Sequence, residues 1–436
     1  MNPLLSRYSN KEVPFRFAGT DLSFFLSQAL FSSYEIDKGS RLLLKTLIQN
    51  IDFDQIGSVL DIGCGVGTLA VSLQKRFPQL RVTMQDRDAL AVAFSRINAD
   101  HNGVAGATVV GGLAFQGLGE QTFDLTASNI PAKVGEPVLR DIFSTMLQRS
   151  KLAAVVVVRP LADYTADSLR ELGAHIPCRE DGPGHTVFLF RAGTDTLLAD
   201  TPAAGSPYAD SAQVRRPSET RADDLPAAYF RNSGRFECGK IPYSLDTVWG
   251  LADFDTVPFQ TRVTEKSLKT LPPFRRLCIW NPGQGHTSTM LAACRAKEYS
   301  PSASSSGAGP SELQLDLMGR DILALQISRH NLLGQQQIRS GRILHCPGPV
   351  EAAVQLKKEE PGATVDLFIV ALEHLAGVPG AHEILEAASM IIADSGTLLI
   401  TGKSAHLSQF ERAPEGFRPL ASKKHKGYKS VVLKRV

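Results

Sequence analysis

The chain has 436 residues, of which 43% are hydrophobic, and it carries a formal net charge of +3. This length and apolar content predict two or more domains of ordinary size, each with its own core. So small a net charge does not indicate nucleic-acid binding, because such domains usually concentrate basic residues on one face. The six cysteines include no Cys-x-x-Cys pair, which argues against a zinc site and a disulfide framework.

The sequence carries no sign of a membrane span or a secretory leader. Its apolar runs stay shorter than about 18 residues, the length that a transmembrane helix needs. Residues 1–7, MNPLLSR, lack the apolar stretch of a signal peptide. The cytoplasm is therefore the expected location.

The most informative stretch of the sequence is the segment 59–68, which reads VLDIGCGVGT. Its apolar start predicts the end of a buried strand, and Thr68 is expected to open a helix that continues over 69–77. Between them, Gly63, Gly65 and Gly67 let the backbone turn sharply and approach a ligand with no Cβ in the way. The pattern indicates a nucleotide-cofactor loop, although glycine-rich turns also bind dinucleotides or serve tight packing.

Two later strands place polar side chains at the same expected edge of the sheet. The strand predicted over 80–85 ends at Asp86, about twenty residues past the loop, where Rossmann-like folds hold ribose hydroxyls with an acid. The strand predicted over 123–128 runs into residues 129–132, which read NIPA. Asn129 alone would indicate a strand-ending turn. Together with the loop and the acid, it favours a functional role, because open α/β sheets bind ligands at this edge.

In order and spacing, DIGCG at 61–65, Asp86 and NIPA at 129–132 resemble the class I S-adenosylmethionine-dependent methyltransferases. Upstream, FSS at 31–33 and IDKGSRLLL at 36–44 are similar to the "methyltransferase small domain" family, which includes the bacterial ribosomal RNA guanine-N2 methyltransferases. The family's usual Asn-Pro-Pro followed by an aromatic or aliphatic residue is replaced here by NIPA. KVGE at 133–136 keeps a family-like basic-x-Gly pattern. The resemblance extends over residues 30–190 and is much weaker afterwards.

This resemblance implies an α/β fold, a Rossmann-like domain with an open, twisted, mostly parallel sheet and helices on both faces. It implies S-adenosylmethionine as the cofactor. The residues expected to hold it lie on the glycine loop and at later strand ends: Asp61, Gly63, Cys64, Gly65, Gly67, Asp86, Arg87, Gly112, Leu113 and Asn129. The implied catalytic group is the run Asn129, Ile130, Pro131 and Ala132, and no metal is expected.

The chemistry of the related amine methyltransferases implies a role for Asn129. Its amide and a neighbouring backbone carbonyl would hold the hydrogens of an exocyclic amine, so that the nitrogen lone pair points at the sulfonium methyl group. Asn129 would orient the amine rather than deprotonate it. Family members usually stack the flipped base on the aromatic ring after the second proline. Ala132 cannot do so, and Phe31 or Tyr34 is the aromatic side chain that we expect in its place.

Residues 236–436 repeat the pattern of residues 17–191. RDALA at 87–91 with SRIN at 95–98 is matched by RDILA at 320–324 with SRHN at 328–331, and GHTVFL at 184–189 is matched by GYKSVV at 427–432. We therefore predict a tandem of two Rossmann-like methyltransferase domains. The boundaries are 1–191 for the S-adenosylmethionine-binding domain, 192–235 for a linker rich in Ala, Asp, Pro, Ser and Arg, and 236–436 for the second copy. A polar segment at 300–311 predicts a surface loop.

The second copy has lost the residues that would carry chemistry. Its loop, at 277–286, reads LCIWNPGQGH. Ile279, Asn281 and Gly319 stand where the first copy has the strand-end acid, the first loop glycine and the ribose acid. The strand at 365–374 has neither the asparagine nor the proline. We interpret residues 236–436 as a degenerate methyltransferase-like domain, kept for substrate grip or for stability.

The leading hypothesis is an S-adenosylmethionine-dependent N-methyltransferase of RNA, with a guanine of ribosomal RNA or a ribosomal subunit as acceptor. Two alternatives stay open: an acceptor that is a protein amide or a small-molecule amine, and a non-catalytic RNA- or ribosome-binding protein. KKHKGYK at 423–429 is either a phosphate contact or a solvated turn before a last strand at 430–433. His185, His286 and His374 lack ligand spacing, and loop or surface positions are expected for them.

Overall fold

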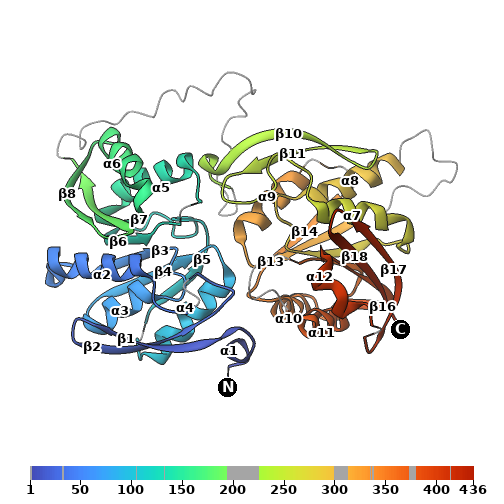
Figure 1. The fold of residues 1–436 in the computed structure, drawn as a ribbon, viewed down its shortest axis with the longest axis horizontal. Helices are drawn as coiled ribbons and strands as arrows, with labels where there is room; N and C mark the ends of the chain where they lie inside the picture. The colour runs from blue at the N-terminus through green and yellow to red at the C-terminus, as the bar shows by residue number, and fades with distance from the viewer. Residues whose placement is uncertain are drawn as a thin grey trace.

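A computed structural model of the chain describes residues 2–31, 34–104, 106–131, 133–193, 225–298, 313–333, 335, 338–372, 380–412 and 414–436. They form two α/β units that lie side by side, the first coloured blue to green and the second yellow-green to red (Figure 1). Several predicted features lie outside the described residues: most of the linker (194–224), the whole 300–311 loop, Ser32, Ser33, Ala132 and His374.

The first unit opens with a short helix and a β-hairpin and then alternates strands with helices. Its elements are α1 (Pro3–Tyr8), β1 (Lys11–Phe17), β2 (Thr20–Leu26), α2 (Lys38–Asn50), a 3-10 turn (Phe53–Gln55), β3 (Ser58–Ile62), α3 (Thr68–Arg76), β4 (Arg81–Asp86), α4 (Ala89–His101), β5 (Thr108–Gly111), β6 (Phe123–Asn129), α5 (Glu136–Arg149), β7 (Ser150–Val158), a 3-10 turn (Arg159–Leu161), α6 (Ala162–Glu171), β8 (Ala174–Asp181) and β9 (His185–Ala192). The sheet has the order β5-β4-β3-β6-β7-β9-β8. β9 runs in the opposite direction to the other six strands, so its pairs with β7 and β8 are antiparallel.

The second unit repeats this plan. Its elements are a 3-10 turn (Ala227–Tyr229), β10 (Phe230–Cys238), β11 (Ile241–Val248), α7 (Phe259–Ser267), a 3-10 turn (Leu268–Thr270), β12 (Arg276–Trp280), α8 (His286–Glu298), β13 (Leu313–Gly319), α9 (Ile322–Leu332), β14 (Ile338–His345), α10 (Pro349–Glu359), β15 (Val365–Ala371), α11 (Ala381–Ile391), β16 (Ile392–Lys403), α12 (Ser404–Leu407), a 3-10 turn (Ser408–Phe410), β17 (Phe417–His425) and β18 (Tyr428–Arg435). The sheet order, β14-β13-β12-β15-β16-β18-β17, is the same as in the first unit. The predicted tandem α/β fold is therefore confirmed.

The predicted elements of the first unit agree with the observed ones to about one residue at each end. The helix expected over 69–77 is α3, and the strands expected over 80–85 and 123–128 are β4 and β6. β10 already begins at Phe230, inside the range that the composition assigns to the linker. Among the described residues, no helix is both long enough and apolar enough to cross a membrane.

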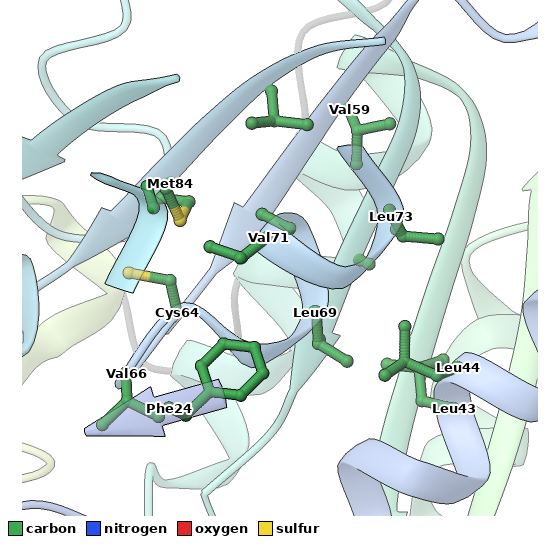
Figure 2. Close-up of a cluster of buried hydrophobic side chains, with 14 of the residues drawn as sticks. Phe24, Leu43, Leu44, Val59, Cys64, Val66, Leu69, Val71, Leu73 and Met84 are labelled. Carbon is green, nitrogen blue, oxygen red and sulfur yellow. The ribbon is translucent and has the colours of Figure 1, made fainter. Parts of the chain in front are cut away.

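One side of the first sheet packs against α2, α3 and the hairpin. Figure 2 shows this cluster, in which Phe24 of β2 and Leu43 of α2 lie near side chains of α3 and the central strands. Every residue of α3 from Thr68 to Gln74 is buried, as expected for a helix enclosed on all sides. Cys64 belongs to the same cluster as a free thiol, and burial raises its pKa well above the usual range. Its role is therefore packing rather than nucleophilic attack.

Equivalent asparagines join the hairpin to the glycine loop in both units. Asn98 accepts a hydrogen bond from the N–H of Phe25 (2.8 Å) and donates to the carbonyl of the same residue (3.1 Å) and to a loop carbonyl (2.9 Å). Asn331 makes the same three bonds to Asp246 (2.8 and 2.9 Å) and its own loop (3.0 Å). The repeat seen in the sequence therefore extends to side-chain contacts.

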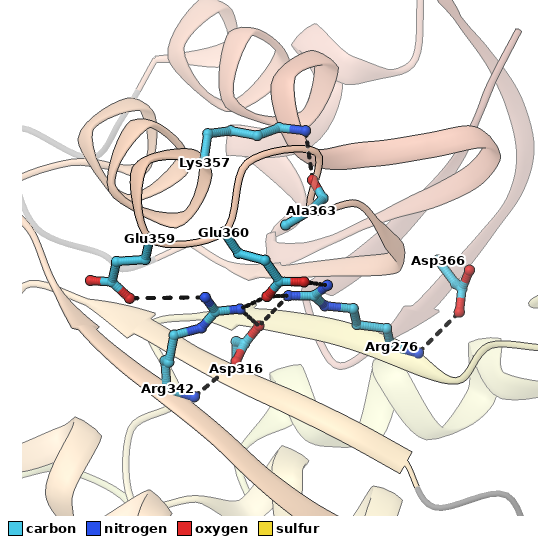
Figure 3. Close-up of polar contacts among 8 residues, drawn as sticks. All are labelled: Arg276, Asp316, Arg342, Lys357, Glu359, Glu360, Ala363 and Asp366. Atoms are coloured by element: carbon cyan, nitrogen blue, oxygen red, sulfur yellow. Dashed lines mark hydrogen bonds and ion pairs between the residues drawn. The ribbon is translucent and has the colours of Figure 1, made fainter.

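The second unit also contains an ion-pair network around a fully buried acid, Asp316 (Figure 3). Arg276 and Arg342 reach this carboxylate at 3.5 and 3.6 Å, and both bind Glu360 at 2.8 and 2.5 Å. The two guanidinium groups hold the pKa of Glu360 down to about 2. A buried carboxylate needs such partners because desolvation is costly for an unpaired charge. The network stabilises the edge of the second sheet.

The two units meet through the repeated Arg-Asp pair. The segment at Arg87 and Asp88 runs antiparallel to the segment at Arg320 and Asp321, with main-chain hydrogen bonds of 2.8 and 3.0 Å. The Arg320 guanidinium binds Asp88 at 2.5 Å, and the Arg87 guanidinium binds Asp321 at 3.2 Å. Equivalent residues of the two copies therefore pair with each other, which the sequence repeat alone does not reveal.

Two further contacts join the units. The Nε2 atom of His345, at the end of β14, lies 2.9 Å from the carbonyl of Arg87. A Cβ on Gly111, at the end of β5, would lie 2.7 Å from the His345 ring, so this close approach requires glycine. The helix α1 also packs on the second unit, where Arg7 pairs with Glu351 at 2.8 Å. The N-terminal helix therefore contacts both copies.

His286 is buried in the second unit, so the expected loop or surface position is wrong for this residue. It opens α8 and is 1% exposed. Its Nδ1 lies 2.9 Å from the hydroxyl of Tyr243, and its Nε2 lies 2.9 Å from the carbonyl of Asp253. Burial lowers its pKa to about 4, so the ring stays neutral. It is a packing residue of the hairpin–helix contact.

The basic segment 423–429 forms the β17–β18 hairpin. Lys426 and Gly427 have positive φ angles, 46° and 81°, and make the turn. Lys429 is buried and paired with Glu411, so it does not contribute to an exposed basic cluster. This geometry favours a turn over a phosphate contact for the segment.

Candidate active site

The glycine loop connects β3 to α3 at the carboxyl edge of the first sheet. Gly63, Gly65 and Gly67 have φ angles of 70°, 57° and 86°, in the left-handed region that favours glycine. A Cβ added to Gly63 or Gly65 would meet nothing within 4 Å, whereas one on Gly67 would lie 3.3 Å from the backbone of Ser95. The first two glycines therefore line open space, and the third permits close packing.

Asp61, near the end of β3, is a buried carboxylate with an unused oxygen. It is 0% exposed, and its Oδ2 accepts a hydrogen bond from the N–H of Ala70 at 3.2 Å. Its Oδ1 has no hydrogen-bond partner among the described residues. Burial raises its pKa to about 7. A buried acceptor left without a partner is costly, so this position suits a ligand or water that donates a hydrogen bond.

Asp86 ends β4 beside the loop. Its Oδ2 accepts from the N–H of Gly65 and its Oδ1 from the N–H of Asp88, both at 2.9 Å. Burial raises its pKa to about 6, although part of the side chain remains exposed. Each carboxylate oxygen can accept more than one hydrogen bond, so the group can still bind a diol.

Asn129 ends β6 and faces the start of α2. Its Nδ2 donates to Asp37 Oδ2 at 2.8 Å and to Ser40 Oγ at 3.0 Å. Among the described residues, none donates a hydrogen bond to its carbonyl oxygen. Next to it, Ile130 is buried and Pro131 is exposed. The predicted fourth member of this group, Ala132, lies outside the described residues.

The remaining predicted cofactor residues divide between the loop after β5 and the interface. Gly112 donates its N–H to the carbonyl of Asp86 at 3.0 Å, while the side chain of Leu113 is buried in the core. The Arg87 guanidinium binds the second unit, at Asp321 and at the carbonyl of Gly250 (3.1 Å). The structure thus gathers the loop glycines and both acids at one sheet edge, with Arg87 turned toward the other copy.

In the second unit, a side chain bridges the corresponding strand ends. Asn281 adopts the left-handed conformation of a loop glycine, with φ 58°, and donates to the carbonyl of Ala371 at 3.3 Å. Trp280, beside it, is 1% exposed. Ala371 is the last residue of β15, as Asn129 is of β6. The side chain of Asn281 therefore spans the gap between strand ends where the first unit has an open loop.

Sequence reasoning missed the contacts of three residues around this site. Asp37 and Ser40 belong to a motif that the resemblance included, yet their contact with Asn129 is not readable from spacing, because 92 and 89 residues separate them. Trp249 of the second unit packs against Gly135, where a Cβ would lie 3.0 Å from its side chain. No sequence signal marked that contact.

Comparisons with known proteins agree with this geometry. The methyltransferase small domain family matches residues 21–154. A Bacillus subtilis protein, the uncharacterized protein YbxB, is 32% identical over 185 residues, which cover 41% of this chain and 90% of that protein. The chain therefore belongs to the methyltransferase small domain family, and its first unit is an S-adenosylmethionine-dependent methyltransferase domain.

Two more relatives carry functional names. The ribosomal RNA small subunit methyltransferase C of Actinobacillus pleuropneumoniae serotype 7 is 41% identical over 112 residues, which cover 26% of this chain. The chain spans only 32% of the length of that relative. The T. thermophilus 16S rRNA methyltransferase RsmC, solved with AdoMet and guanosine, matches over 99% of both chains with a TM-score of 0.61 and 13% identity. At that identity the likeness shows a shared tandem fold.

Proposed function

We propose that the protein methylates the exocyclic N2 amine of a guanine in ribosomal RNA, with the first unit as the catalytic domain and residues 236–436 as a degenerate copy. The observation that carries this proposal is the side chain of Asn129, whose Oδ1 accepts no hydrogen bond from the described residues, at the sheet edge that also holds the glycine loop and Asp61. The names of the relatives support RNA as the acceptor. Such an acceptor agrees with a cytoplasmic location.

The residues of the first unit fit S-adenosylmethionine. The unused oxygen of Asp61 suits a donor on the ligand, Asp86 suits the ribose hydroxyls, and Gly63 and Gly65 leave room for close approach of the backbone. S-adenosylmethionine supplies the methyl group: the C–S bond breaks with its electron pair on sulfur, the amine lone pair forms the N–C bond, and one amine proton leaves to solvent. The side-chain oxygen of Asn129 would accept a hydrogen bond from the amine N–H and so direct the lone pair of the amine nitrogen at the methyl group. Orientation of this kind corresponds to effective molarities on the order of 10⁵ M or more.

Two exposed aromatic side chains precede α2, on the chain that leads to Asp37. Phe31 is 71% exposed and Tyr34 is 61% exposed. Large aromatic rings at this exposure are available for stacking, which contributes about 1–3 kcal/mol per base. We propose that one of them takes the place of the aromatic residue that the NIPA motif lacks.

The test is methyl transfer from labelled S-adenosylmethionine to total RNA of a strain that lacks this gene, followed by nucleoside analysis. N2-methylguanosine as the labelled product would support the proposal. The Asn129→Ala variant should bind S-adenosylmethionine normally and transfer slowly, whereas Asn50→Ala, at the exposed end of α2, serves as the matched control. Label in protein or small molecules only, or RNA binding without turnover, would reject the proposal.

A further inference from the structure

The contacts of Asn129 with the start of α2 have a consequence for the acceptor site. Building on the proposed function, we propose that Asp37 and Ser40 are positioning residues that hold the Asn129 amide in one orientation, with its carbonyl oxygen toward the acceptor amine. Neither residue needs to touch the acceptor for this role. Both act through Asn129.

The chemistry of the carboxylate decides which way the amide points. An ionised carboxylate only accepts hydrogen bonds, so the atom 2.8 Å from Asp37 Oδ2 must be the amide nitrogen. The hydroxyl of Ser40, 3.0 Å from the same nitrogen, can accept the second amide hydrogen. With both hydrogens committed, only Oδ1 remains for a ligand. The usual ambiguity of an asparagine amide is thereby removed.

This orientation matters because an exocyclic amine approaches with N–H donors. A carbonyl oxygen accepts one of them, whereas a flipped amide would present NH2 to NH2 and leave two donors unpaired. A freely rotating Asn129 would spend part of its time in that unproductive state. The contacts that hold the amide therefore keep the oxygen of Asn129 in place before the acceptor amine binds.

The motif DKGS at 37–40 provides the groups that hold the Asn129 amide. Asp37 caps α2, because its Oδ2 also accepts from the N–H of Ser40 at 3.0 Å. A Cβ on Gly39 would lie 2.8 Å from this Oδ2 and 3.0 Å from the ring of His185, so glycine leaves the space that the carboxylate occupies. The cap, the space and the second acceptor thus come from three residues within one turn of helix.

The second unit supports the link between the cap and the amide. The helix equivalent to α2 is α7, whose N-cap is Pro258 with no side-chain cap hydrogen bond. The strand equivalent to β6 ends in Ala371 instead of an asparagine. The copy without the amide therefore also lacks the acid that would hold it.

The test separates capping from positioning. Asp37→Ser keeps an N-cap residue but is too short to reach Asn129, and Asp37→Asn keeps an acceptor oxygen of the same length. With both substrates saturating, we expect Asp37→Ser to slow single-turnover methyl transfer about 10- to 100-fold and Asp37→Asn to restore much of the rate. Ser40→Ala should have a smaller effect in the same direction. Asp52→Ser is the matched control, because Asp52 caps an exposed turn elsewhere.

A double-mutant cycle shows whether Asp37 acts through the amide. In an Asn129→Ala background, adding Asp37→Ser should change the rate less than about twofold, since the group that it positions is gone. Fully additive losses, or an Asp37→Ser enzyme as fast as the wild type, would overturn the inference while leaving the proposed function intact. If the wild type instead methylates another amine, the proposed function fails and the same cycle is measured on that acceptor.

A second measurement does not depend on activity. In protein labelled with 15N-asparagine, the side-chain NH2 signals of Asn129 are assigned by their loss in Asn129→Ala. We expect Asp37→Ser to move these signals to the position of solvent-exposed amides and to speed their exchange with water, with no change in Asp52→Ser. Unchanged signals in Asp37→Ser would refute the positioning role, whatever the acceptor is.

Discussion

Asp61 gives the sharpest prediction, because the structure buries its charge completely. Burial raises the pKa of Asp61 from 3.8 to about 7, because ionising this carboxyl costs more free energy in the folded chain than in the unfolded one. The unfolded state releases its proton near pH 4 and the folded state only near pH 7. The contribution of Asp61 to folding stability therefore becomes less favourable as pH rises between these values and is constant above them.

The Asp61→Asn variant removes this titration. A shift of about three pKa units corresponds to on the order of 4 kcal/mol. The asparagine oxygen can still accept from Ala70, but its buried NH2 replaces an unpaired oxygen and costs about 1–3 kcal/mol. We therefore expect the ligand-free variant to be about 1–3 kcal/mol more stable than the wild type at pH 8. At pH 5 only about one unit of the shift acts, so the variant should gain no stability or be slightly less stable than the wild type. It should not bind S-adenosylmethionine, so the ligand would stabilise only the wild type.

Trp280 is buried in the second unit and Trp249 packs against Gly135 at the contact between the units, so tryptophan fluorescence would not report on the first unit alone. Hydrogen exchange in increasing urea, followed on peptides of β3 and α3, measures the stability of the first unit directly. Exchange rates are corrected for their intrinsic dependence on pH. A variant that is no more stable at pH 8, or a gain that is the same at pH 5 and pH 8, would refute the reasoning.

Three other predictions concern the same molecule. S-adenosylmethionine affinity should fall as pH is lowered from 8 to 5, because Asp61 and Asp86, with pKa values raised to about 7 and about 6, take up protons and lose their charge; calorimetry that finds a constant affinity would contradict this. Calorimetry should also give one S-adenosylmethionine per chain, since the second unit has Ile279 in place of the strand-end acid and Asn281 bridges its strand ends; a stoichiometry of two would contradict this. Gly111→Ala should cost about 1–3 kcal/mol by pushing a Cβ against the imidazole at the end of β14. Gly184→Ala, where a Cβ meets no atom within 4 Å, should leave the melting temperature nearly unchanged.

The loop and the strand ends were readable from local sequence because each depends on local properties. Gly63 and Gly65 need positive φ, and β3 is buried over nearly its whole length because a central parallel strand is covered on both faces. The duplication was readable because both copies keep the same packing residues, such as Asn98 and Asn331. The surface position expected for His286 was wrong because a lone histidine carries no local signal of burial.

The sequence alone thus determined the α/β class and the tandem repeat, and it predicted which residues would hold S-adenosylmethionine. Periodicity, glycine spacing and the residue at each strand end are properties of short segments, so they can be recognised from neighbouring residues alone. Only the tertiary structure decided that Asn129 donates a hydrogen bond to Asp37, that Arg87 pairs with Asp321 and that Asn281 donates a hydrogen bond to Ala371. These contacts join residues far apart in the chain, and they depend on how whole helices and sheets pack rather than on any local pattern.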